Sequence, residues 1–140
     1  MRKGNCQAAI GSRETHVTTG AVVQSYKDLR VWREAMDLAE ACYRLSTGFP
    51  RDEAYGLTAQ VRRSAVSVPA NITEGYGREN TGSYVQFLKI AQGSLKELET
   101  HLALAERVGI VSAEATTPIL DRWEVVGKML NALIRSLQRQ

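Results

Sequence analysis

The segment NTGSYVQFLKIAQGSLKELETHLALAERVG, residues 80–109, has the most regular pattern of apolar residues in the chain. Its apolar positions recur at alternating spacings of four and three residues, which places them on one face of a helix. Asn80 or Thr81 is expected to cap the start of this helix, and Gly109 to close its end. The positions on the apolar face are Tyr84, Leu88, Ala91, Leu95, Leu98, Leu102 and Ala105.

The flank of this face is also suited to contact with other helices. Phe87, Ile90 and Ser94 lie beside the main apolar face and widen it, so we expect this helix to contact more than one neighbour. Gly93 and Ser94 are small enough to let another helix approach closely. The neighbouring segments should therefore supply partners for two sides of the helix.

A segment of about residues 28–47 shows the same helical period earlier in the chain. Gly48 and Pro50 follow it, and this pair is typical of the end of a helix because Gly closes the last turn and Pro cannot extend it. We expect the buried face of this helix to consist of Leu29, Trp32, Met36, Ala39 and Tyr43.

The next helix is predicted to begin near Asp52, whose carboxylate can cap it, and to end at Gly75 and Gly77. Pro69 falls inside the apolar period. Because proline removes one backbone donor and crowds the carbonyl of Ala65, we expect a kink at Pro69 and not a break. The expected buried positions are Leu57, Val61, Ala65, Val68 and Ile72.

The last helix is predicted to begin at Thr117, with Pro118 at the first helical position, and a preliminary turn from Ser112 is the alternative start. No segment of the chain shows sustained alternation with a period of two. Four amphipathic helices joined by short loops predict an all-α protein, an antiparallel up-down four-helix bundle. The expected buried positions of the last helix are Ile119, Trp123, Val126, Leu130, Leu133 and Leu137.

Residues 1–25 lack this order and mix Gly, Ser, Thr and charged residues without a period. We expect a flexible leader over residues 1–25 and a single bundle domain over residues 26–140. Polar residues interrupt every apolar run after the basic start, unlike the continuous apolar core of a secretory signal. No stretch reaches the roughly 20 uninterrupted apolar residues of a membrane span. The sequence therefore predicts a cytoplasmic protein with no membrane association.

Composition agrees with one soluble domain, since the 140 residues are 44% hydrophobic and 24% charged. The net charge is +3, but residues 1–25 contribute +2, and the rest of the chain holds 15 basic against 14 acidic side chains. A nucleic-acid site must therefore come from clustering of basic residues, or from repetition of a small patch in an oligomer. Cys6 and Cys42 are expected to be free thiols; a reactive Cys42 would need positive neighbours, which the adjacent residues do not provide.

Patterns for catalysis and metal binding are missing from the sequence. Glu97 and His101 are spaced by four residues, whereas a di-metal bundle uses Glu-x-x-His on two helices. We therefore expect His101 to lie on a helix surface or rim. No nucleophile elbow, phosphate-binding loop or dinucleotide motif is present. The sequence predicts a non-enzyme with no catalytic residue, no cofactor and no metal ligand.

Residues 60–75, QVRRSAVSVPANITEG, form the most distinctive motif of the chain. This motif resembles the signature of the four-helix-bundle family named for proteins encoded by intervening sequences of bacterial 23S rRNA genes. The resemblance extends over roughly residues 26–138 and includes YKDLRVW at 26–32, FLKIA at 87–91, GSLKEL at 93–98 and KML at 128–130.

This resemblance implies an antiparallel four-helix bundle in a homo-oligomer, because related members form five-fold rings, which are pentamers. A related branch is the accessory variability determinant protein of diversity-generating retroelements. That protein binds nucleic acid and a partner reverse transcriptase through a basic surface. The chain departs from the family at Ser64, where alanine is common, and in the leader before Tyr26.

Within the motif, a structural role is expected for Ser67, Pro69, Asn71, Glu74 and Gly75. The polar side chains beside the expected kink can satisfy the carbonyl that proline leaves without a donor. For Glu74 we expect an ion pair with Arg78 or with an arginine from another helix, at a helix end where a buried pair fixes the packing.

Arg62 and Arg63 are the best candidates for phosphate contact. Adjacent helical residues differ by about 100° in direction, so at least one of them must leave the core face. Arg78, Lys89 and Lys96 can extend the patch along the two middle helices. The alternative is that all five are ordinary solvated charges balanced by the glutamates nearby.

The aromatic residues offer no clear platform for stacking nucleic-acid bases. Trp32 and Trp123 lie on the apolar faces and are expected in the core, whereas Tyr26, Tyr55 and Tyr76 lie nearer helix ends and are free to be exposed.

Two functions remain open. The first is a bacterial, non-enzymatic, pentameric bundle that binds structured RNA or DNA through a basic surface. The second is a structural or adaptor protein that binds another protein through an exposed apolar patch, such as Phe87 with Ile90, and has no nucleic-acid role.

Overall fold

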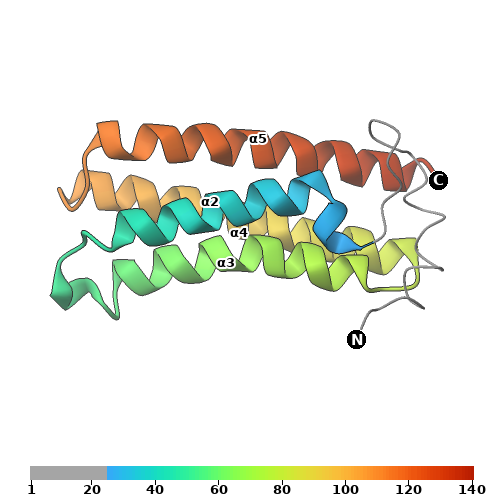
Figure 1. Ribbon diagram of the computed structural model, residues 1–140, viewed down its shortest axis with the longest axis horizontal. Coiled ribbons are helices and arrows are strands. Elements are labelled where there is room, and N and C mark those ends of the chain that lie inside the picture. The colour runs from blue at the N-terminus through green and yellow to red at the C-terminus, as the bar shows by residue number, and fades with distance from the viewer. Residues whose placement is uncertain (1–24) are drawn as a thin grey trace.

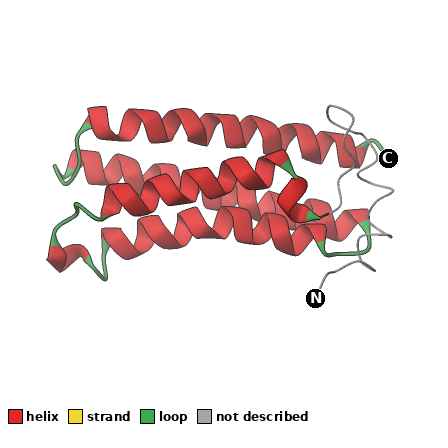
Figure 2. Cartoon of the chain, in the orientation of Figure 1, coloured by secondary structure: helices red, strands yellow, loops and turns green. Residues whose placement is uncertain are grey.

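The structure is a computed structural model that describes residues 25–140. The predicted leader, apart from Ser25, lies outside the described residues. Helices joined by short loops make up the described chain, and it contains no strand (Figure 2). In chain order the elements are the 3-10 helix η1 (Tyr26–Asp28), α2 (Arg30–Ser46), the 3-10 helix η2 (Arg51–Glu53), α3 (Leu57–Tyr76), α4 (Thr81–Arg107) and α5 (Ala113–Gln138).

The four long helices lie side by side and alternate in direction (Figure 1). Helix α3 packs between α2 and α4, and α5 packs between the same two helices on the other side, so that α2 and α4 stand on a diagonal. The contact between α3 and α4 is the most extensive. The predicted antiparallel up-down four-helix bundle is confirmed. Within residues 25–140, none of the helices is apolar over enough of its length to cross a membrane.

Helix α4 follows the sequence prediction at both ends. The Asn80 side-chain oxygen accepts a hydrogen bond from the backbone nitrogen of Ser83 at 2.7 Å, which caps the first turn. At the other end Gly109 has a φ of +81°, and the backbone nitrogen of Ile110 donates to the carbonyl of Ala105 at 2.9 Å. This is the glycine-closed helix end that the sequence predicts. All seven predicted apolar positions of α4 are buried.

The predicted start of α3 near Asp52 is wrong. Asp52 belongs to the short helix η2, and the chain turns before α3 begins at Leu57. The backbone of Gly56 has φ −103° and ψ −117°, outside the helical region, so helix η2 cannot continue through it. The Glu53 carboxylate accepts from the backbone nitrogen of Leu57 at 2.9 Å and so takes the capping role assigned to Asp52.

Beyond its first turn, α3 has the predicted continuity, end and core positions, and the kink at Pro69 stays a prediction. It runs without a break through Pro69 to Tyr76. Four of the five predicted core positions are fully buried and Leu57 is partly buried at the rim.

The predicted start of α5 at Thr117 is also wrong, and the alternative from Ser112 is confirmed. The Ser112 hydroxyl caps the helix by accepting from the backbone nitrogen of Ala115 at 3.2 Å. Thr116 is buried and donates a hydrogen bond to the Glu106 carboxylate of α4, which anchors this first turn. Because the turn is held by a tertiary contact, Pro118 is accommodated inside the helix instead of beginning it.

The period of α2 was predicted correctly, but its buried face only in part: Leu29 and Ala39 are buried as predicted. Val31, Ala35, Leu38 and Cys42 face the core, together with Ala39, whereas Met36 and Tyr43 are 43% and 44% exposed. Trp32 is only partly buried. Both sets of residues have helical spacing, so the period alone cannot choose between them. The small side chains of Ala35 and Cys42 face the centre because they let α2 approach the other helices, and the bulky ones cover the edge of its contact with α3.

Candidate functional site

Arg62 is held rigidly between α2 and α3. Its Nε donates to the Ser46 hydroxyl at 2.7 Å, and its Nη2 donates to the Tyr43 carbonyl at 3.4 Å. The guanidinium carbon lies 4.6 Å from the centre of the Tyr43 ring. These contacts tie α3 to the last turn of α2, so Arg62 has a structural role in addition to any ligand contact.

Arg63 points away from the bundle. It is exposed, and its Nη1 donates to the Gln60 side-chain oxygen at 3.1 Å. Beside it lies an open groove of about 470 Å³, called here the α2–α3 groove. Two of the residues that line the groove are arginines and none is acidic. The lining residues are Tyr43, Ala54, Thr58, Ala59, Arg62, Arg63, Val66 and Ser67.

Arg78 follows the end of α3 and is held there by two side-chain contacts. It forms an ion pair with Glu74 at 2.7 Å, and its guanidinium carbon lies 4.7 Å from the centre of the Phe87 ring. The predicted pairing of Glu74 with Arg78 is therefore confirmed. The predicted burial of this pair is wrong, because the two side chains are 55% and 45% exposed, and such a pair adds little stability.

Lys89 and Lys96 are exposed on α4. Lys96 lines a second groove of about 310 Å³, which is bounded on its other side by Trp123, Glu124 and Lys128 of α5. Arg62 and Arg63, by contrast, lie on the side of α3 that faces α2. The five predicted basic residues thus do not form one patch along α3 and α4. Helical spacing could not show this, because the faces of two helices are related only through their packing.

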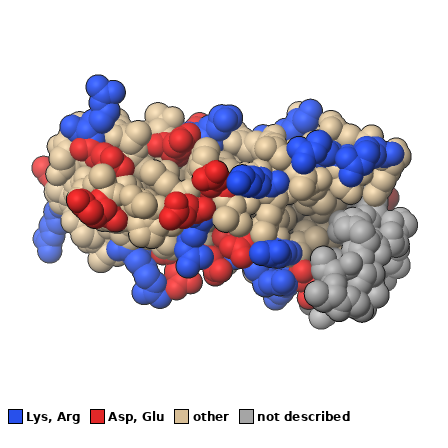
Figure 3. Space-filling model, turned by 90° about the horizontal axis from the view of Figure 1, so that it is seen from above, with Lys and Arg blue, Asp and Glu red and all other residues tan. Residues whose placement is uncertain are grey.

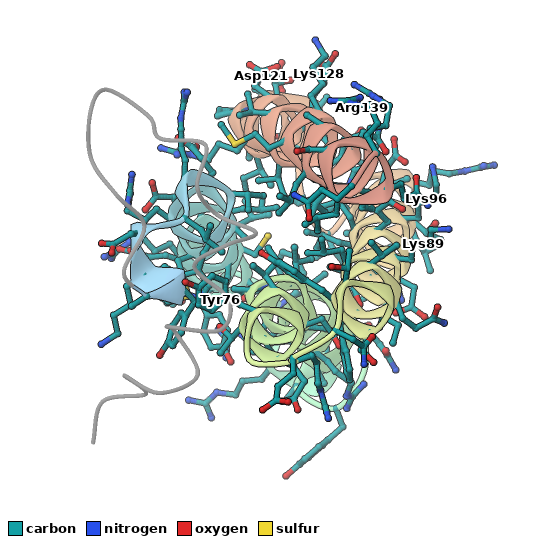
Figure 4. All side chains as sticks on the ribbon, turned by 90° about the vertical axis from the view of Figure 1, so that its right-hand side faces the viewer. Tyr76, Lys89, Lys96, Asp121, Lys128 and Arg139 are labelled. Carbon is teal, nitrogen blue, oxygen red and sulfur yellow. The ribbon has the colours of Figure 1, made fainter. Side chains whose placement is uncertain are left out.

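The structure does bring Lys89 and Lys96 together with basic residues of α5. Residues 81–96 and 125–140 contain no acidic side chain, and the antiparallel arrangement places these two segments beside each other. Figure 4 shows the labelled members of this group pointing outward at the corner formed by α4 and α5. We call this surface the basic half of the α4–α5 face; it consists of Lys89, Lys96, Lys128, Arg135 and Arg139.

The other half of the same face is acidic. In Figure 3, which looks onto α5, Lys and Arg gather toward the right of the upper edge and acidic residues are more frequent toward the left. Lys128 stands at the boundary and pairs with Glu124 at 3.6 Å in an exposed contact. The acidic half of the α4–α5 face contains Glu97, Glu99, Glu106, Glu114, Asp121 and Glu124.

Lys128, Arg135 and Arg139 were not predicted from the sequence as members of this surface. The signal available was the absence of any acidic residue after Glu124. This absence becomes informative only in the folded bundle. There the first part of α4, which also lacks acidic residues, lies beside the end of α5.

A polar contact crosses the buried interface between α3 and α4. The hydroxyl oxygens of Ser67 and Ser94 are 2.7 Å apart, and the Asn71 amide donates to the carbonyl and hydroxyl of Ser67 at 2.8 and 3.0 Å. The expectation that these side chains satisfy the Ala65 carbonyl is therefore wrong for Asn71. Its amide instead orients the serine that bonds to α4, which is a structural role.

Small residues let α3 and α4 approach closely at this interface. A Cβ atom on Gly75 would lie 2.9 Å from the Cβ of Phe87 and 3.2 Å from the Tyr84 carbonyl. Ser94 is buried, as predicted for close approach, but Gly93 faces open space and its predicted packing role is wrong. His101 is partly buried at the rim of this interface, with its Nδ1 3.3 Å from the Ser64 hydroxyl.

The aromatic residues divide differently from the prediction. Tyr76 is buried, although it was expected to be free for exposure, and Tyr26 packs edge-on against Trp32. Tyr55 is 97% exposed. Trp123 is partly buried and donates from its indole nitrogen to the Leu95 carbonyl at 2.6 Å.

Two observations on residues 25–140 concern the Cys42 thiol and the groups that could hold a metal ion. Burial raises the pKa of the Cys42 thiol to about 12, which opposes the reactive interpretation of this residue. Cys6 lies outside the described residues. No group of three or more His, Cys, Asp or Glu side chains is arranged to hold a metal ion in this part of the chain.

Comparison with known proteins gives a family and a fold. The family model described as "23S rRNA-intervening sequence protein" matches residues 27–132. No curated protein has a matching sequence. A similar solved structure is the crystal structure of a protein of unknown function from the S23 ribosomal protein family of Bacteroides thetaiotaomicron. It has a TM-score of 0.70 and 23% sequence identity, and the match covers 75% of this chain and 95% of that one.

Proposed function

The chain belongs to the 23S rRNA-intervening sequence protein family, and from this premise we propose that it is a non-enzymatic, cytoplasmic protein that binds structured RNA or DNA. The observation that carries the proposal is the basic half of the α4–α5 face. The chain as a whole is only weakly basic, so a local group of five cations without acidic residues on the same two segments is a specific feature.

These cations suit contact with a nucleic-acid backbone. Lys89, Lys96, Arg135 and Arg139 are exposed and have no ion pair within residues 25–140. Phosphates release condensed counterions when such side chains neutralise them, and this release drives binding. If all five cations meet phosphates, the logarithm of the binding constant falls with the logarithm of the salt concentration with a slope of roughly −4.

Assembly would strengthen this site. We propose a homo-oligomer, in the form of a pentamer, on the basis of the family resemblance described above. Each basic half would then be repeated, and several weak contacts on one long nucleic acid would add through effective concentration. The same resemblance supports a relation to the accessory variability determinant protein, with a reverse transcriptase as a protein partner, and we extend the proposal to that partner.

The test compares two double variants of equal charge change. Lys96→Glu with Lys128→Glu reverses the basic half, whereas Arg44→Glu with Arg107→Glu reverses two exposed arginines at the opposite end of the bundle. We expect the first variant to bind a labelled RNA hairpin or DNA duplex at least tenfold more weakly at low salt. The control variant should lose much less, and the mass in solution should be equal for both. Equal losses in both variants would contradict the assignment of the site.

The adaptor alternative predicts an apolar patch at Phe87 and Ile90. Ile90 is 45% exposed, but Phe87 is partly buried beneath Arg78, so the apolar area at this position is small. A well-folded oligomer that binds neither RNA nor DNA at low salt would favour the adaptor function over the one proposed.

A further inference from the structure

The α2–α3 groove is a second cationic surface, separate from the basic half of the α4–α5 face. The two surfaces lie on different sides of the bundle, because α2 and α3 form one side and α4 and α5 the other. The groove combines an aromatic ring, two arginines and the Thr58 hydroxyl, with no carboxylate; Ser67 also lines it, but its hydroxyl is bonded to Ser94 of α4. Its volume of about 470 Å³ lies in the range of small-molecule sites.

One wall of the groove is a fixed, flat layer. The Arg62 guanidinium lies over the Tyr43 ring and is held by its bonds to Ser46 and to the Tyr43 carbonyl. Tyr43 itself is 44% exposed. A rigid guanidinium–aromatic layer at a protein surface is a surface on which another planar ring can stack, at little cost in side-chain entropy.

Two exposed side chains, one in the groove and one next to it in the sequence, are available to a ligand. Arg63 lines the groove, and its only described hydrogen bond in residues 25–140 is the exposed one to Gln60. Tyr55 follows the groove residue Ala54 directly and is 97% exposed, the highest value of any large hydrophobic residue in the described chain. A cation for phosphate therefore lines the groove, and an exposed ring suited to stacking follows one of its residues in the chain.

We propose that the α2–α3 groove binds an unpaired nucleotide of an RNA or DNA strand. Its phosphate lies on Arg63, its base lies against the Arg62–Tyr43 layer, and a flanking base stacks on Tyr55. Bases inside a duplex have no free face for such a wall, so the groove selects single-stranded segments. The inference rests on the proposed nucleic-acid function and adds to it: the α4–α5 face holds the backbone of a structured element, and the groove holds a nucleotide outside the paired region.

The experiment uses two fluorescein-labelled probes, a single-stranded RNA of about ten nucleotides and a blunt RNA duplex of the same sequence. Tyr55→Ala and Arg63→Gln should each weaken binding of the single strand about tenfold and leave duplex binding within about twofold. Tyr55→Phe and Arg63→Lys keep the ring and the charge and should bind the strand nearly as well as the natural chain.

Matched controls come from the last turns of α4, which contribute no residue to the groove. Leu104→Ala and Arg107→Gln also remove an exposed apolar side chain and an exposed charge, and they should bind both probes normally. Strand binding that is unchanged in Tyr55→Ala and Arg63→Gln overturns the groove proposal. If duplex binding is at the same time lost in the Lys96→Glu, Lys128→Glu variant, the proposed function stands without the groove. If the natural chain binds neither probe, both proposals fail.

Discussion

Helix α4 has two neighbours, and the two interfaces are built differently. Against α3 it packs closely through Gly75 and a buried pair of serine hydroxyls, Ser67 and Ser94. Against α5 the contact is filled by larger groups, such as the Trp123 indole on the Leu95 carbonyl, and a groove remains between Lys96 and Lys128. The buried side of the motif at residues 60–75 lies in the close interface, whereas the basic half of the α4–α5 face lies at the rim of the looser one.

This difference separates residues that hold the fold from residues that are available to a partner. A close helix contact requires small side chains and satisfied polar groups, so each position there is constrained by its neighbour. A lysine at a solvated rim contributes little to folding and is free to meet an anion. When the residues shared with a family are mainly packing residues, the resemblance therefore indicates the fold more directly than the function.

The largest effect should come from breaking both interfaces together. Leu98 is fully buried on α4, and Leu98→Ala removes core contacts and leaves a cavity, so we expect a loss of about 2–5 kcal/mol in the free energy of unfolding. Leu104→Ala on the same helix, where the side chain is 47% exposed, should cost less than about 0.5 kcal/mol. Urea unfolding followed by circular dichroism measures both. Similar losses for the two variants would contradict the observed face of α4.

The next largest effect on stability should come from replacing a glycine at the close α3–α4 interface, and a glycine at the α4–α5 interface serves as the comparison. Gly75→Ala forces a Cβ to 2.9 Å from Phe87 and should destabilise the protein by about 1–3 kcal/mol. Gly127→Ala places a Cβ 3.5 Å from the Leu95 side chain, an ordinary contact, and alanine favours helix by about 1 kcal/mol, so this variant should be neutral or more stable. Thermal unfolding of both proteins is the measurement, and the same sign for both would show that the interfaces are equally close.

A smaller effect is expected from the polar pairs that cross the two interfaces. Ser94→Ala removes the buried partner of Ser67 and should cost about 1 kcal/mol. Gln92 donates to Asn131 of α5 in an exposed pair, so Gln92→Ala should change stability by no more than about 0.5 kcal/mol. Chemical denaturation resolves this difference if both variants are measured with the natural chain. A larger loss of stability from Gln92→Ala than from Ser94→Ala would contradict this prediction.

The smallest effect should come from charge at the α4–α5 rim. Lys89→Glu reduces repulsion within the basic half, and no acidic residue lies within four positions of Lys89 along α4, so in the absence of ligand and at low salt the variant should gain a few tenths of a kcal/mol. The gain should disappear in high salt because the charges are screened. Thermal unfolding at two salt concentrations tests this, and nucleic-acid binding by the same variant should fall. A variant that loses both stability and binding would point to a structural role for Lys89.

Much of the fold could be predicted because helix α4 is an unambiguous pattern. One helical period with a capping asparagine and a closing glycine leaves a single consistent helix, and the structure confirms its core. Helix α2 has two overlapping sets with the same period, so the choice between Trp32 and Val31 as core residues needed the shape of the neighbouring helices. The start of α5 needed the Thr116 contact to Glu106, which no local pattern reveals.

The candidate site was predictable only in part. Arg62 and Arg63 were identified as a pair, but their separation into a packed arginine and an exposed one depends on Tyr43 and Ser46 of α2. Lys89 and Lys96 were identified without their neighbours on α5. Tyr43 was expected in the core and therefore missed as a groove residue.

The sequence by itself determined that the chain forms four amphipathic helices, where most of them end, and which family it belongs to, because period, caps and motifs act over a few residues. Only the tertiary structure decided which basic residues share a surface. Residues 81–96 and 125–140 are separated by almost thirty positions along the chain, and they become one cationic surface only when antiparallel packing places α4 beside α5. Electrostatic fields add over distance in space and not along the sequence, so the charge pattern acquires its meaning in the folded bundle.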